Sequence, residues 1–109
     1  MPHGGALYVR GSAILARQGL EAAIDEFWRR RSLPAMVDVA RANQLICLPA
    51  YLPPERKGIA PRVSYLWTSL SGYAHHHPYE LTVLPVELAP IVDQVSVLVQ
   101  ELSELFDEG

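Results

Sequence analysis

Hydrophobic residues recur at helical spacing along most of this 109-residue chain. A proline-free stretch from about residue 6 to residue 31 predicts the longest helix. Its apolar face is made of five residues: Val9, Ala13, Leu20, Ile24 and Phe27. Small side chains also follow one another along one face of this stretch, at Ser12, Ala16, Gly19 and Ala23. This small-residue stripe predicts close approach of another helix, either from the same chain or from a second copy.

Two further long helices are predicted in the second half of the chain. One spans about residues 59–77, and His77 continues its apolar stripe of Val63, Leu66, Leu70 and Tyr73. The other spans about residues 89–107, with apolar residues at Ile91, Val95, Leu98, Leu102 and Leu105. This alternation of intervals of four and three is typical of a helix-bundle seam. A second apolar line, at Val92, Val99 and Phe106, predicts that the last helix is covered on more than one side.

A shorter and less regular helix is predicted between the long ones, over about residues 34–48. Ser32 is its expected N-cap, and Pro34 stands in its first turn. The proline-rich residues 49–58 predict an ordered loop. The sequence has no alternating strand pattern and no internal repeat. We therefore expect a single all-α domain over residues 1–109, built as an antiparallel four-helix bundle.

The composition favours a globular protein with more apolar surface than one small core needs. Half of the residues are hydrophobic and 19% are charged. We therefore expect a homodimer. No apolar run reaches the roughly 18 residues of a membrane span, and the N-terminus lacks a signal-peptide pattern, so we expect a cytoplasmic protein without membrane contact. The single cysteine, Cys47, lies in an apolar run and is expected to be a small buried residue.

Charges of opposite sign are separated along the chain. All nine Lys and Arg residues lie at or before Arg62, together with five acids, whereas seven acids and no Lys or Arg follow. This separation predicts attraction between helices of one bundle or dimer. The triplet Arg29, Arg30 and Arg31 ends the first helix, where cations complement the last carbonyl groups. Phosphate contact is the alternative, because the planar guanidinium offers several donors.

Three consecutive histidines, His75, His76 and His77, end the third predicted helix, where a proline follows. Neighbouring helical positions point about 100° apart, so the three cannot bind one ion while they are helical. His77 alone continues the core-facing stripe, and it is the candidate general acid or base. We predict no cofactor and no bound metal.

Two segments carry a resemblance to a known family. The sequence ILARQGLEAAIDEFW of the first helix and LSGYAHHHPYEL before the last helix resemble HEPN (higher eukaryotes and prokaryotes nucleotide-binding) domains. The resemblance implies a small, commonly dimeric helical bundle from toxin–antitoxin, antiviral or RNA-processing systems. Many such domains are metal-independent ribonucleases with an arginine, four to six residues, and then a histidine. The catalytic histidine would correspond to His77, with His75 and His76 as its neighbours.

The arginine of that motif is absent from this chain. Its allowed positions before the three histidines run from Thr68 to Gly72, and none is arginine. Without that cation, developing negative charge on a phosphate lacks a positioned donor. The resemblance therefore implies a noncatalytic protein-interaction or RNA-associated module in a toxin–antitoxin or defence system. Its expected partner is a nucleotidyltransferase-like antitoxin or an RNA.

Two alternatives stay open. The first is a metal-independent ribonuclease in which His77 works with an arginine of the first helix, Arg10 or Arg17. Tyr79 and Glu80 complete the candidate binding residues around this histidine. The second alternative is a histidine metal site, for which His3, Glu80 or a second subunit would provide the further ligands.

Overall fold

The computed structural model describes residues 2–74 and 85–106 of the chain. These residues form four α-helices and three short 3₁₀-helices, and they contain no strand, which confirms the all-α prediction. The α-helices are α1 (Pro2–Arg30), α2 (Arg41–Cys47), α3 (Ile59–Ala74) and α4 (Pro85–Glu104). The 3₁₀-helices are η1 (Pro34–Asp38), η2 (Leu48–Tyr51) and η3 (Pro54–Arg56).

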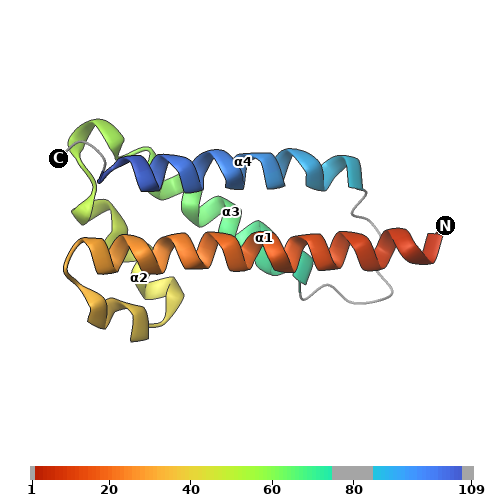
Figure 1. The fold of residues 1–109 in the computed structure, drawn as a ribbon, viewed down its shortest axis with the longest axis horizontal. Helices are drawn as coiled ribbons and strands as arrows, with labels where there is room; N and C mark the ends of the chain where they lie inside the picture. Colours follow the sequence, from red (N-terminus) through yellow and green to blue (C-terminus); the bar gives the residue numbers. More distant parts are fainter. Residues whose placement is uncertain (1, 75–84, 107–109) are drawn as a thin grey trace.

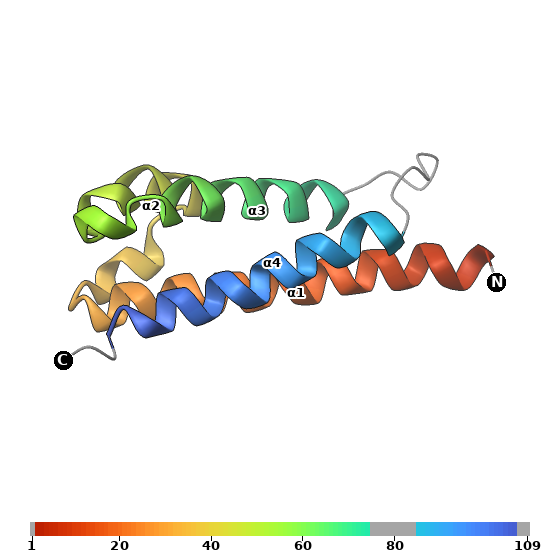
Figure 2. The same ribbon diagram turned by 90° about the horizontal axis from the view of Figure 1, so that it is seen from above.

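Three long helices make the body of the bundle. Helices α1 and α4 lie side by side and run in the same direction, and α3 runs against both (Figure 1). Seen from above, α3 forms a second layer over this pair (Figure 2). Helix α2 has seven residues and flanks α3 near one end of the bundle. The molecule is therefore a bundle of four helices in which α2 is too short to span the length of the others. The predicted antiparallel arrangement holds for α3 against α1 and α4, but α1 and α4 are parallel neighbours.

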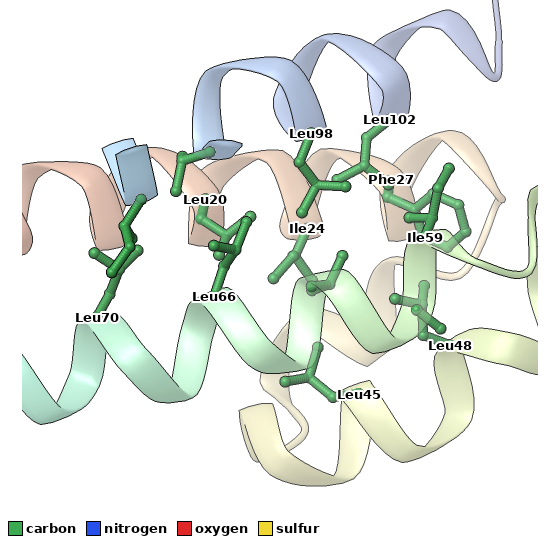
Figure 3. Packing of buried hydrophobic residues seen from close by; sticks show 14 of the residues in the cluster. Leu20, Ile24, Phe27, Leu45, Leu48, Ile59, Leu66, Leu70, Leu98 and Leu102 are labelled. Carbon is green, nitrogen blue, oxygen red and sulfur yellow. The ribbon is translucent and has the colours of Figure 1, made fainter. Parts of the chain in front are cut away.

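The core lies between the three long helices, along the predicted apolar faces. Leucine and isoleucine side chains from α1, α3 and α4 point toward one another in Figure 3. Four residues of the predicted seam of α4 are buried: Ile91, Val95, Leu98 and Leu102. The fifth, Leu105, is partly buried. Removing one such side chain from water contributes about 2 kcal/mol to folding. Regular apolar spacing therefore located the long helices and their inward faces.

The predicted second helix over residues 34–48 is wrong as a continuous element. The chain forms η1, breaks into extended backbone at Val39 (φ −79°, ψ 145°), and only then forms α2 and η2. The side-chain amide of Gln44 donates to the carbonyl oxygens of Met36 (2.6 Å) and Val39 (2.7 Å). A buried amide thus occupies carbonyl groups that a continuous helix would pair with its own backbone.

Ser32 ends α1 instead of capping the next helix. Its φ of 62° places it in the left-handed region, and the N-cap of η1 is Leu33, without a side-chain cap. The Leu33 amide donates to the Trp28 carbonyl (2.9 Å), and the Ser32 amide donates to the Arg29 carbonyl (3.0 Å). These two bonds form a Schellman motif, in which the left-handed residue usually is glycine.

Two further predictions are corrected. Helix α4 begins at Pro85 rather than near residue 89, so Pro90 lies inside it. Pro90 is exposed, and it has no backbone N–H to donate to the preceding turn. Cys47 is exposed rather than buried, because Leu45 and Leu48 take the inward positions beside it.

Candidate functional site

The histidine site predicted from the sequence lies outside the described residues. His75, His76 and His77 fall between the end of α3 and the start of α4, and so do Tyr79 and Glu80. Their predicted roles stay predictions. The candidate site below is built from chemically active side chains in the described part of the chain.

The two arginines proposed to act with His77 in the ribonuclease alternative both lie on α1. Arg10 and Arg17 are seven residues apart, or about two turns, and Arg17 is partly buried. Glu21, one turn after Arg17, accepts a hydrogen bond from Trp67 Nε1 (3.0 Å). Its carboxylate also lies 3.7 Å from Arg41 Nε. Glu21 therefore helps to join α1 to α2 and α3.

A buried glutamine organises the contact between α1 and α2. Gln44 is 1% exposed, and its Oε1 accepts from Trp28 Nε1 (3.2 Å) and from Arg41 Nη1 (2.8 Å). Its Nε2 donates to two carbonyl groups of the preceding segment. Sequence reasoning missed this residue, although Gln44 precedes the buried Leu48 by one helical turn and therefore shares its face.

Arg41 completes this buried network. Its side chain is 19% exposed, and its Nη1 donates to Asp25 Oδ1 at 2.7 Å. The guanidinium thus lies between Asp25 of α1 and Gln44 of its own helix. A charge-assisted bond of this length is among the stronger side-chain contacts in a protein. Arg41 is therefore a structural cation that fixes α2 against α1.

Six of the other cations belong to segments that meet at the end of the bundle where α1 and α4 finish and α3 begins (Figure 1). We call this group the cationic end: Arg29, Arg30, Arg31, Arg56, Lys57 and Arg62. The polar contacts of these side chains join the segments. Arg31 donates to the carbonyl of Tyr51, and Lys57 donates to the carbonyl of Pro49 (2.7 Å). The arginine triplet is thereby combined with cations that are distant in sequence.

The fold also places aromatic rings among these cations. The Arg30 guanidinium lies 5.3 Å from the ring centre of Phe106, and that of Arg31 lies 5.7 Å from it. Tyr51 is 41% exposed, and its ring packs edge-on against Trp28 with 5.4 Å between centres. Phe106 and Tyr51 come from segments far from the triplet in sequence, so their position beside it follows from tertiary structure alone.

One carboxylate at the cationic end is held loosely. Glu26 lies 4.0 Å from Arg29 and 3.9 Å from Arg30, and all three side chains are about half exposed. Exposed ion pairs at such separations contribute little, about 0–1 kcal/mol each. The guanidinium groups of Arg29 and Arg30 can therefore exchange this carboxylate for another anion at small cost. Glu101, by contrast, is 25% exposed and lies 2.6 Å from Arg62 and 4.0 Å from Arg56.

Among residues 2–74 and 85–106, no group of three or more His, Cys, Asp or Glu side chains could hold a metal ion. None of the helices in this part of the chain is both long and apolar enough to cross a membrane. Comparisons with models of protein families, with curated proteins and with solved structures find no match for this chain. The cationic end is therefore interpreted from its own residues.

Proposed function

We propose that the protein is a noncatalytic, HEPN-like helical module that contacts the phosphate backbone of RNA with its cationic end. The observation that carries the proposal is that six cations lie in segments that meet at one end of the bundle, where Arg31 donates to the carbonyl of Tyr51, an exposed aromatic residue. Guanidinium groups bind phosphate oxygens in a two-pronged geometry. An exposed aromatic ring offers a surface on which an unpaired base stacks. Together these groups suit single-stranded RNA better than a carboxylate ligand.

The charge balance limits how such binding can work. The whole chain carries a net charge of −3, which opposes nonspecific attraction to RNA. Binding therefore depends on the local excess of cations, and it should be sensitive to salt. On single strands, each neutralised phosphate contributes about 0.7 to the slope of log affinity against log salt. Contact with three phosphates predicts a slope of about −2.

The noncatalytic part of the proposal rests on Gly72. This residue stands at the four-residue spacing before His77 where the motif would carry arginine. Gly72 is exposed on α3, and a β-carbon built on it would meet nothing within 4 Å. A noncatalytic module should leave labelled RNA intact over hours in the presence of a chelator. Cleavage that disappears in His77→Ala would support the ribonuclease alternative instead.

The binding test uses fluorescence anisotropy of a fluorescein-labelled single-stranded RNA of about 20 nucleotides, in 50 and 200 mM salt. Arg29→Gln combined with Lys57→Gln should weaken binding by about tenfold at the lower salt. Both side chains are exposed, so their replacement should leave the core intact. Absence of measurable RNA binding by the unmodified chain in 50 mM salt would reject the proposal.

A second double variant separates local charge from net charge. Gln94→Glu with Ser96→Glu changes the net charge by the same amount, at exposed positions in the middle of α4. It should change the RNA affinity by less than about twofold, because surface charges beyond a Debye length are screened. A loss of binding in Arg10→Gln with Arg17→Gln, rather than in the cationic-end variant, would place the contact beside the predicted histidine site.

A further inference from the structure

A cavity of about 220 Å³ opens between α1 and α4, toward the end of both helices. Five apolar side chains form its floor: Ala23, Phe27, Val99, Leu102 and Phe106. An apolar cavity of about 150 Å³ is large enough to hold one benzene molecule. The cavity between α1 and α4 therefore has room for a single aromatic ring with a short polar arm.

Two of the floor residues are aromatic, and their rings meet edge to face. The ring centres of Phe27 and Phe106 are 5.8 Å apart, with 62° between the ring planes. Phe27 is buried and also packs edge-on against Trp28, so the core fixes its position. A third ring in the cavity can add edge or offset contacts to this pair, which contribute beyond the burial of area. The floor therefore favours an aromatic ligand over an aliphatic one of equal size.

Cations are in excess at the mouth of the cavity. Arg30 lines the cavity, and its guanidinium lies 5.3 Å from the ring centre of Phe106. The guanidinium of Arg31 lies 5.7 Å from the same ring centre. Glu26 is the one carboxylate among the described residues that line the cavity, and it lies 3.9 Å from Arg30 and 4.0 Å from Arg29. Both distances are too long for a hydrogen bond, so Glu26 does not occupy the donors of Arg30.

We propose that this cavity binds a small aromatic carboxylate, with its ring on the floor and its carboxylate on the guanidinium of Arg30. A guanidinium holds a carboxylate through two parallel N–H···O bonds. Ser103 is exposed and lines the cavity, and its hydroxyl can donate to the same carboxylate. An aromatic amine is disfavoured, because its ammonium group would lie among arginines. Such a ligand site is independent of the proposed contact with RNA.

Titration of the ¹⁵N-labelled whole chain with phenylacetate, followed by the shifts of its amide signals, tests the site. Binding should saturate with a dissociation constant of about 1 mM or lower, and the largest shifts should fall in residues 23–30 and 99–106. Acetate lacks the ring and phenethylamine lacks the carboxylate, so each should bind at least about tenfold more weakly. Equal binding of either compound, or no saturation by about 10 mM phenylacetate, would overturn the proposal.

Arg30→Gln tests the charged contact, and Arg29→Gln is its matched control. Both arginines are exposed and lie near Glu26, but only Arg30 lines the cavity. Arg30→Gln should raise the dissociation constant of phenylacetate by at least about tenfold. Arg29→Gln removes the same charge and should raise it by less than about twofold, because solvent screens a charge outside the cavity. Equal weakening would mean that general positive charge attracts the ligand, and it would contradict a contact with Arg30.

A filled cavity tests the place of the ring. Ala23→Leu adds a larger side chain to the floor, whereas Ala22→Leu adds it at an exposed neighbouring position that does not line the cavity. The first variant should weaken phenylacetate binding by at least about tenfold, and the second should leave it unchanged. Circular dichroism checks that both variants keep their helices. Unchanged binding in a folded Ala23→Leu variant would place the ligand elsewhere and reject the cavity as its site.

Discussion

At the scale of single residues, Gln44 is a buried side chain that makes four hydrogen bonds. Replacing it by leucine would leave the Trp28 indole N–H and two backbone carbonyl groups without their buried partner. Each buried polar group left unpaired costs about 1–3 kcal/mol. We expect Gln44→Leu to lower the free energy of unfolding by about 3 kcal/mol, measured by urea denaturation followed by circular dichroism.

The matched control is Gln100→Leu on α4. Gln100 is exposed, and its amide makes a hydrogen bond of 3.2 Å to Glu104 one turn later. Water can replace that bond, so the change should alter stability by less than about 0.5 kcal/mol. Similar losses in the two variants would mean that the Gln44 network does not hold α2 in place.

At the scale of elements, the end of α1 is set by an unusual residue. Ser32 has a φ of 62°, a conformation that costs a residue with a β-carbon about 1 kcal/mol or more. Ser32→Gly should therefore raise the free energy of unfolding by about 1 kcal/mol, as seen in thermal and urea unfolding. Ser96→Gly, at an exposed position inside α4, should instead lower it by about 0.5 kcal/mol. The same sign in both variants would contradict the left-handed assignment.

The elements also show what the sequence could and could not predict. Regular spacing identified α1, α3 and α4, because most of their buried residues repeat along one helical face. The prediction of one continuous second helix was wrong because the amide of Gln44 bonds to backbone carbonyl groups. The spacing of apolar residues does not reveal such a contact. Of the cationic end, the sequence revealed the arginine triplet, because its three residues are contiguous. Its link to Tyr51 spans 20 residues and appears only after folding.

At the scale of the whole molecule, the separation of charge along the chain becomes a contact between helices. Arg62 of α3 lies 2.6 Å from Glu101 of α4, and Arg56 approaches the same carboxylate at 4.0 Å. The shorter contact is an ion pair that lacks hydrogen-bond geometry. This arrangement agrees with the predicted attraction between the basic and acidic parts.

The side chain of Glu101 is 25% exposed, so solvent screens its ion pairs less than those of Glu26, which is 55% exposed. We expect Glu101→Gln to lower the free energy of unfolding by about 1 kcal/mol in 50 mM salt and by less in 500 mM salt. Glu26→Gln should change it by less than about 0.5 kcal/mol at either salt concentration. Urea unfolding of both variants at the two salt concentrations measures the difference. If the loss in Glu101→Gln were independent of salt, packing of the side chain rather than charge would join α3 to α4.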